Sequence, residues 1–203
     1  MNLNHIYWAF TGVISDEDCK EIIKIAKRQK LEKAKVFKSS FDLEAGNKLR
    51  NSEVCFLNNP FIYDLLHPFL NIANRNAGWN FQYDYSESAQ FTSYKKHQHY
   101  GWHQDCILDQ HTNNSDPNFR GKIRKLSMIM SLSDPKAYKG GALEFYIPNP
   151  EKKSIQEQSV TCHEIEKKGS VVVFPSFMWH RVLPVTKGTR YSLVMWTLGQ
   201  NYK

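Results

Sequence analysis

The segment Tyr100-Gly101-Trp102-His103-Gln104-Asp105 places an imidazole and a carboxylate two positions apart. Side chains i and i+2 of an extended strand point to the same face, so we expect His103 and Asp105 to reach one metal ion together. A second imidazole, that of His180, follows far downstream. The fold must therefore bring together two strands that are remote in the sequence.

Two nitrogens and one carboxylate occupy one face of an octahedron and leave three positions open, as in non-heme Fe(II) oxygenases. Arg190 follows in Arg190-Tyr191-Ser192-Leu193, where Arg190 and Ser192 share a strand face. Its permanently charged guanidinium suits the carboxylate of a co-substrate. An unpaired arginine inside an apolar barrel is very unfavourable, so we expect a bound dianion or a structural Asp or Glu beside it. The pattern predicts an enzyme with a site for a metal and an anion.

His97 and His99 offer a competing His-x-His pair of the type that cupin metal sites use. No suitably spaced carboxylate follows them before His103, and they fall in a turn between predicted strands. We interpret them as surface or rim residues. The remaining histidines are isolated, and ordinary surface or core positions account for them: His5, His67, His111 and His163.

From residue 79 onward, short runs with strand character alternate with turn signals. The last eight of these runs suit a double-sheet jelly roll, or double-stranded β-helix, with a mouth for a small ligand. In this arrangement His103 and Asp105 lie on an early strand, His180 on a late strand and Arg190 on the next and final strand. The predicted strands are near 80–84, 88–96, 100–107, 124–133, 142–147, 160–165, 170–175, 178–184 and 189–198.

Two helices are predicted before the strand-rich part of the chain. Ser15-Asp16-Glu17-Asp18 is typical of an N-cap followed by acidic residues in the first turn, and it predicts a helix to about Lys30. Asn59-Pro60 predicts the start of a second helix, which continues to about Asn76. Short strands are predicted near Lys33–Phe37 and Ser52–Leu57.

The predicted fold class is mainly β (α+β), with residues 1–203 in a single domain. Residues 1–78 form a helical N-terminal support, with both helices packed on one outer face of a jelly-roll core in residues 79–203. Two polar stretches, Leu108–Ile123 and Pro148–Ser159, are longer than ordinary hairpin turns. They are either a substrate lid and a rim loop or disordered surface insertions.

The composition is that of an ordered globular protein, with 41% hydrophobic and 13% aromatic residues in a chain of 203. No apolar run is long enough to span a bilayer, and the N-terminal residues lack a secretory pattern. The four cysteines are scattered without a Cys-x-x-Cys pair. We therefore expect reduced thiols, a cytoplasmic location and no membrane partner.

The net charge of +7 comes mostly from one segment, because Lys20–Lys38 contains eight Lys or Arg and two Glu. This excess lies on and after the first predicted helix and not around the predicted metal. An acidic partner such as nucleic acid is one interpretation. A solvated helix face is the simpler one, since no aromatic residues are interleaved for base stacking.

Taken together, the motifs resemble the Fe(II)/2-oxoglutarate-dependent dioxygenases, and among them the prolyl 4-hydroxylase-like branch. The likeness extends from about residue 12 to residue 198. It rests on Arg50-Asn51-Ser52, Glu87–Tyr94, Tyr100, His103, Asp105, Arg124–Met130, Gly140-Gly141, Gly169–Pro175, His180 and Arg190–Trp196.

The resemblance implies Fe(II) at the three predicted metal ligands. It also implies 2-oxoglutarate as co-substrate, with its far carboxylate bound by Arg190, Ser192 and Tyr94. Members of the family convert 2-oxoglutarate to succinate and carbon dioxide as they hydroxylate a substrate. Relatives commonly use ascorbate to keep the iron reduced, so ascorbate is a candidate auxiliary reductant here.

Further positions match the family around its substrate cleft, and ordinary strand packing or surface charge is the alternative reading for each: Tyr100, Arg124, Glu87, Arg50 and Trp196. Two positions depart from the family. Ser131 stands where many relatives carry a tyrosine near the co-substrate, and Leu198 stands where a substrate-side histidine is expected. These departures concern the substrate and leave the metal ligands intact.

The resemblance implies hydroxylation of an amino-acid side chain, with peptidyl proline as the first expectation. One alternative is a free amino acid or another small metabolite. Another is oxidative demethylation of nucleic acid, but such enzymes usually carry a second arginine six residues after the first, where this chain has Trp196. Nucleic acid is therefore not the expected partner. A non-catalytic binding module on the same fold tends to have lost a metal ligand, and none is missing. The sequence carries no signal for the oligomeric state.

Overall fold

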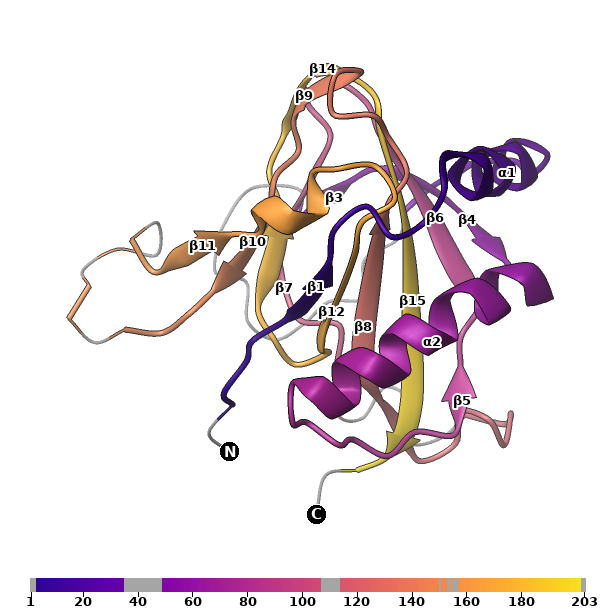
Figure 1. The fold of residues 1–203 in the computed structure, drawn as a ribbon, viewed down its shortest axis with the longest axis vertical. Helices are drawn as coiled ribbons and strands as arrows, with labels where there is room; N and C mark the ends of the chain where they lie inside the picture. The colour runs from indigo at the N-terminus through magenta and orange to yellow at the C-terminus, as the bar shows by residue number, and fades with distance from the viewer. Residues whose placement is uncertain are drawn as a thin grey trace.

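Two antiparallel β-sheets pack face to face, and two helices cover the outer face of the larger sheet (Figure 1). The computed structural model describes residues 3–34, 49–106, 114–149, 151–152, 154 and 157–201. In spatial order the larger sheet contains β1 (Trp8–Phe10), β12 (Val171–Pro175), β8 (Lys122–Ser131), β15 (Arg190–Gln200), β6 (Ala89–Tyr94), β4 (Glu53–Leu57) and β2 (Glu32–Lys33), with β5 (Tyr85–Ser86) paired to β15.

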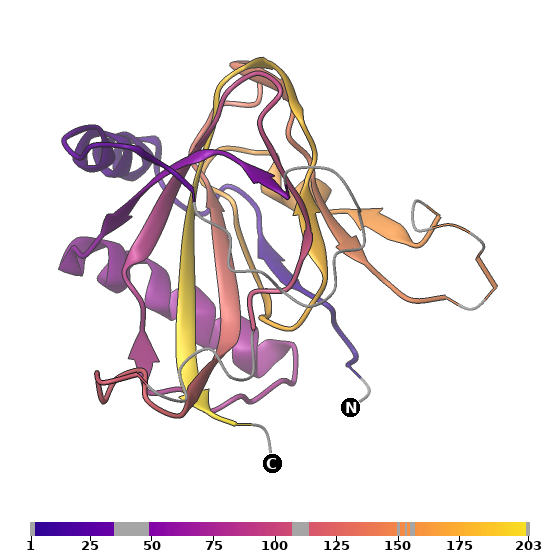
Figure 2. The ribbon, with the colours of Figure 1, turned by 180° about the vertical axis from the view of Figure 1, so that it is seen from behind.

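The smaller sheet contains β11 (Ser159–Thr161), β10 (Leu143–Tyr146), β13 (His180–Val182), β7 (His99–His103) and β3 (Arg50–Asn51) in spatial order. A two-stranded ribbon joins β9 (Tyr138–Gly140) to β14 (Val185–Gly188). The view from behind shows the hairpin of β10 and β11 projecting to one side, away from the helices (Figure 2). This architecture is the mainly-β jelly roll that the sequence predicts.

The two helices begin where the sequence places their caps. Helix α1 (Asp16–Lys27) begins after Ser15, whose hydroxyl accepts a hydrogen bond from the Asp18 N–H at 3.0 Å. Helix α2 (Pro60–Asn76) begins after Asn59, whose side chain accepts from the Phe61 N–H. A proline at the first helical position lacks only an N–H that the helix does not use. A single 3₁₀ turn, η1 (His163–Ile165), follows β11.

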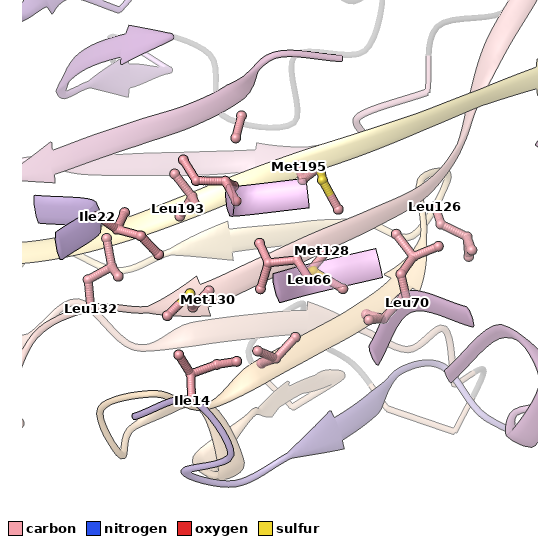
Figure 3. Packing of buried hydrophobic residues seen from close by; sticks show 14 of the residues in the cluster. Ile14, Ile22, Leu66, Leu70, Leu126, Met128, Met130, Leu132, Leu193 and Met195 are labelled. Carbon is pink, nitrogen blue, oxygen red and sulfur yellow. The ribbon is translucent and has the colours of Figure 1, made fainter. Parts of the chain in front are cut away.

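The main core lies between the helices and the larger sheet, as Figure 3 shows. In β15 the side chains alternate, so Leu193 and Met195 point to this core. They pack with Met128 of β8 and with Leu66 of α2, all of which are almost fully buried. The polar and cavity-lining side chains of β15 therefore lie on the opposite face.

A second core lies between the two sheets and joins their inner faces. Ile129 and Val194 of the larger sheet belong to it, as do Leu143, Phe145 and Val182 of the smaller sheet. Beyond this cluster the space between the sheets opens into a cavity of about 500 Å³. Residues of both sheets therefore line this cavity.

The predicted strand boundaries needed four corrections. No strand forms at 80–84, where Asn80 has a positive φ and the Asp84 N–H bonds to β15 before the short β5 begins. The strand predicted at 100–107 ends at His103, so Asp105 lies in the following turn. Residues 163–165 form a 3₁₀ turn beyond β11, the edge strand of the smaller sheet. The ribbon strand β14 comes between His180 and Arg190.

The two long polar stretches are described only in part. Residues 107–113 of the first and residues 150, 153, 155 and 156 of the second lie outside the described residues. The proposed lid and rim loop therefore remain predictions. Likewise β2 is found at Glu32–Lys33, and the rest of the predicted strand, from residue 35 to Phe37, lies outside the described part of the chain.

No helix in the described residues is both long enough and apolar enough to cross a membrane. All four cysteines are free thiols: Cys19, Cys55, Cys106 and Cys162. The expectation of unpaired cysteines is confirmed.

Leu66→Ala tests the packing of α2 on the larger sheet. We expect a loss of about 2–5 kcal/mol in the free energy of unfolding, because the truncation leaves a cavity at a position that is 1% exposed. The measurement is the midpoint and slope of urea unfolding. Leu65→Ala on the same helix, where the side chain is only half-buried, is the matched control. Equal losses in the two variants would contradict this account of the core.

Candidate metal centre

Two imidazoles face each other across a pair of neighbouring strands. His103 at the end of β7 is directly opposite His180 at the start of β13. The Nδ1–H of His103 donates to the Gly101 carbonyl, and that of His180 donates to the Met178 carbonyl, each at 2.9 Å. These bonds fix the tautomer in which Nε2 carries a free lone pair. Both rings therefore present a metal-binding nitrogen to the same space.

Asp105 completes the group from the turn after β7. Its Oδ1 lies 3.6 Å from His103 Nε2, and its Oδ2 lies 3.6 Å from His180 Nε2. The three possible ligand atoms all lie within 4.8 Å of one another, and all three residues are buried. The sequence correctly predicted that these three residues lie together, but the predicted strand does not extend to Asp105. Asp105 reaches the histidines from a turn that hydrogen bonds hold, rather than from a continued strand.

Two serines hold that turn and its carboxylate, and the sequence reasoning missed both. The Ser127 hydroxyl on β8 donates to Asp105 Oδ2 at 2.7 Å and lies 2.9 Å from the Ser176 hydroxyl. The Ser176 carbonyl accepts from the N–H groups of Asp105 and Cys106. A polar residue on the inward face of the apolar run Leu126–Met130 was the available signal for Ser127.

The electrostatics favour metal-ready protonation states. Burial alone would raise the pKa of the Asp105 carboxyl, but the imidazoles of His180 and His103 outweigh burial and hold that pKa well below its ordinary value. Burial and the neighbouring His103 lower the pKa of His180 to about 4. At neutral pH the site thus offers a carboxylate and an uncharged imidazole. This donor set fits a divalent transition metal such as Fe(II).

Arg190 lines the same cavity as the three candidate ligands. It lies at the start of β15, is 2% exposed and pairs in register with Tyr94, whose ring centroid is 5.6 Å from the guanidinium carbon. Its Nη1–H donates to the Ser192 hydroxyl at 3.5 Å. Within the described residues no carboxylate forms an ion pair with Arg190. A structural Asp or Glu, one of the two predicted partners, is therefore not found there.

Gly141 makes room for this arginine. Its φ is +67°, and a Cβ at this position would lie 2.9 Å from Arg190 Cδ and 3.0 Å from a Val185 methyl group. Only glycine adopts this backbone freely, and only glycine leaves the side of the Arg190 stem open. The Gly140-Gly141 turn thus leaves space for the Arg190 side chain.

Four of the five predicted substrate residues line the cavity, and the fifth supports one of them. The Arg124 guanidinium stacks on the Trp196 ring at 3.9 Å, and the Arg50 guanidinium stacks on the Tyr100 ring at 4.5 Å. Glu87 does not line the cavity. It accepts from Arg124 Nε at 2.5 Å and from Nη2 at 2.7 Å, so it neutralises that arginine.

Tyr100 and the competing histidine pair can also be compared with their predicted positions. Tyr100 stacks on His103 with ring centroids 3.5 Å apart, which orients that imidazole. The competing pair His97 and His99 belongs to no group of metal-ligating side chains in the described part of the chain, where the His103, Asp105 and His180 cluster is found. His97 lies in the turn before β7 with a positive φ.

The sequence matches the family model of the 2OG-Fe(II) oxygenase superfamily over residues 89–198, just over half of the chain. It is 27% identical over 191 residues to the PKHD-type hydroxylase YbiX of Escherichia coli, an alignment that covers 91% of this chain and 75% of that protein. Further PKHD-type hydroxylases match over a shorter part, such as 54% of this chain and 42% of the relative.

Solved structures share the fold at low sequence identity. A Pseudomonas putida prolyl-4-hydroxylase superposes with a TM-score of 0.68 at 16% identity, covering 98% of this chain and 95% of that one. A Trichoplax adhaerens prolyl hydroxylase, solved with a peptide fragment of the hypoxia inducible factor oxygen degradation domain, superposes with a TM-score of 0.62 at 14% identity. That match covers 96% of this chain and 84% of the other.

Ser127→Ala tests whether the hydroxyl bond to Asp105 prepares the metal site. We expect metal affinity to fall about tenfold or more, because groups that orient a metal ligand typically contribute 10- to 100-fold. The measurement is calorimetric titration of the metal-free protein with Mn(II) under a fixed buffer.

The control is Ser127→Thr, which retains a hydroxyl and should retain most of the affinity. Ser131→Ala, four residues along the same strand face and without a recorded bond to Asp105, should leave the affinity unchanged. Equal affinities for Ser127→Ala and the wild-type protein would rule out this positioning role.

Proposed function

Because this chain belongs to the 2OG-Fe(II) oxygenase superfamily, we propose that it hydroxylates an amino-acid side chain of a protein or peptide, with proline as the first candidate. It is a dioxygenase whose cofactors are Fe(II) and the co-substrate 2-oxoglutarate. The choice of a peptide substrate, the residue roles and the extent of the catalytic domain, taken here as residues 1–203, are parts of the proposal.

His103, Asp105 and His180 would hold the iron. Bound there, Fe(II) with 2-oxoglutarate supplies the oxidising power to insert one atom of dioxygen into a C–H bond, while 2-oxoglutarate becomes succinate and carbon dioxide. The protein's own contribution is to fix the ligands and to exclude water. The hydrogen bonds from both Nδ1–H groups and from the Ser127 hydroxyl fix the ligands. The burial of the three ligands keeps water away.

The observation that carries the co-substrate assignment is the buried guanidinium of Arg190. A charge without a counter-ion in such a place costs several kcal/mol by desolvation. A dicarboxylate that enters the cavity removes this cost, since the planar guanidinium can pair with a carboxylate through two parallel hydrogen bonds. Ser192 and Tyr94 lie beside Arg190 and would bind the same carboxylate.

A peptide substrate is supported by the wall of the cavity next to Asp105. The Trp196 ring lines the cavity and carries the Arg124 guanidinium at 3.9 Å, so the two side chains form a flat surface against which a peptide can pack. Arg124 is already paired with Glu87, so its guanidinium provides a stacking surface for a substrate and little uncompensated charge. The peptide-bound Trichoplax adhaerens neighbour shows that this fold accommodates a peptide in a related protein.

The compartment remains a proposal too. We propose a cytoplasmic location, and the four unpaired thiols support a reducing environment. Ascorbate as auxiliary reductant stays a prediction of the family resemblance.

The test of the proposed function is mass spectrometry of proline-containing peptides and of cell extract incubated with the iron-loaded enzyme. We expect a gain of one oxygen atom that depends on 2-oxoglutarate, together with one succinate per product. Both signals should disappear in His103→Ala and Asp105→Ala and after removal of iron with a chelator. A gain of oxygen confined to a small metabolite would overturn the peptide assignment, and undiminished turnover in both variants would refute the metal site.

Arg190→Met tests the co-substrate assignment separately. We expect 2-oxoglutarate affinity to fall at least about tenfold, because a charge-assisted hydrogen bond contributes about 1.5–3 kcal/mol. Arg190→Lys should lose less affinity for 2-oxoglutarate, since lysine keeps the positive charge but cannot form the two parallel hydrogen bonds of a guanidinium. The measurement is calorimetry with the Mn(II)-loaded protein. Arg75→Met, an exposed arginine at the end of α2, is the control and should bind normally. Normal binding by Arg190→Met would reject the assignment.

A further inference from the structure

Part of the basic segment reaches the mouth of the catalytic cavity. Lys30 follows α1 and Lys33 ends β2, and both line the same cavity as the three candidate iron ligands. The sequence predicted that the charge excess lies away from the metal, and these two residues of the segment extend it to the outer end of the cavity that contains the candidate ligands. The cause is the pairing of β2 with β4, which carries the segment to the edge of the sheet that forms the cavity wall.

At the outer end of the cavity, positively charged side chains outnumber negatively charged ones among the described residues. Among the residues that line it, Lys30, Lys33 and Arg50 provide three cations against the carboxylate of Glu32. Glu53 pairs in register with Lys33, but its carboxylate forms an ion pair with Lys95 at 2.7 Å. Earlier lysines of the same segment are paired on α1, such as Lys20 with Asp16 at 2.5 Å. By contrast, no carboxylate partner is recorded for the three cations of the mouth within the described ranges, and Arg50 bonds to the Ser52 hydroxyl.

An exposed aromatic side chain lies on the same wall. Phe56 is 58% exposed, and it is the exposed large hydrophobic residue that lines the cavity in the described part of the chain. Side chains of its strand β4 alternate, so Cys55 and Leu57 belong to the core under the helices while Val54 and Phe56 lie on the opposite face. Val54, Cys55 and Phe56 all line the cavity. An aromatic surface left open beside unpaired cations indicates a site for a ligand with apolar and anionic parts.

We propose that this outer mouth, formed by Lys30, Lys33, Arg50 and Phe56, selects peptides that carry carboxylates next to an apolar side chain. This inference rests on the proposed function, because it names the class of peptide that the hydroxylase accepts. The inner cavity takes the residue to be hydroxylated and 2-oxoglutarate, while the mouth binds the flanking residues. Complementary charge at such a rim speeds association and excludes peptides of the wrong sign.

A peptide fits the mouth better than a nucleic acid does. Non-specific binding of single strands uses several aromatic platforms along a continuous basic groove. Here Phe56 is the exposed aromatic side chain, and the Tyr100 ring in the same cavity is covered by the Arg50 guanidinium. Glu32 lies between Lys30 and Lys33 in the sequence and lines the same cavity. Flanking side chains of a peptide can avoid that carboxylate, whereas a chain of regularly spaced phosphates cannot.

The test compares three fluorescent peptides of equal length, each with a central Leu-Pro pair flanked by Glu, by Ser or by Lys. Binding is followed by fluorescence anisotropy with the Mn(II)- and 2-oxoglutarate-loaded protein, so that no peptide is consumed. We expect the Glu-flanked peptide to bind most tightly, with affinity that falls as salt is added. Lys30→Glu combined with Lys33→Glu should weaken its binding by about tenfold or more at low ionic strength.

The matched control is the double reversal Lys139→Glu with Lys187→Glu, which changes net charge equally on the ribbon of β9 and β14, where neither lysine lines the cavity. It should bind the Glu-flanked peptide as the wild-type protein does. Phe56→Ser should weaken binding about fivefold by removing apolar contact, and exchange of the leucine for serine in the peptide should abolish that difference.

Several results would overturn the inference: equal binding of the three peptides, preference for the Lys-flanked one, or no binding of the Glu-flanked peptide at millimolar concentration. Tighter binding of a single-stranded oligonucleotide of the same length would assign the mouth to nucleic acid instead. Succinate formation by the iron-loaded wild-type protein is measured alongside, with each of the three peptides and with cell extract. Succinate without any charge preference rejects only this inference, whereas absence of succinate rejects the proposed function.

Discussion

The pairing of β7 with β13 is the constraint on which the catalytic centre depends. It sets His103 against His180 in the same register, so two imidazoles separated by most of the jelly roll in sequence become neighbours. The remaining ligand then needs only a turn that points back toward them. Asp105 provides it, and its main-chain bond to Ser176 ties that turn to the segment that leads into β13. One strand pair thus sets the positions of the two imidazoles and, through the turn after β7, that of the carboxylate.

The cavity separates charges that are satisfied within the protein from charges that await a ligand. Asp105 accepts a hydrogen bond from the Ser127 hydroxyl and lies between two imidazoles, and Arg124 is balanced by Glu87. Arg190 has a weak bond to Ser192 and no described counter-ion. The unbalanced charge of Arg190 therefore supports the proposed co-substrate position independently of the family likeness.

Much of the site could be predicted because period-two alternation decides which strand residues face inward. That rule places His103, Arg190 and Ser192 correctly, and the capping residues predict both helices. It fails for Asp105, since the strand ends two residues earlier and long-range bonds to Ser127 and Ser176 replace the ladder. Local sequence patterns also could not predict where the basic segment lies in the fold. It depends on a two-residue strand whose partner lies some twenty residues away.

The ligands come from β7, from the turn after it and from β13, and these strands carry the irregular register of the smaller sheet. An ion held there would act as a cross-link between segments that the helical core does not touch. Because ligands that bind only the folded state stabilise it, iron would suppress local opening of this sheet and protect its amides from hydrogen exchange. The metal is then a structural element of the substrate face, and its loss would loosen that face while the helical layer stays intact.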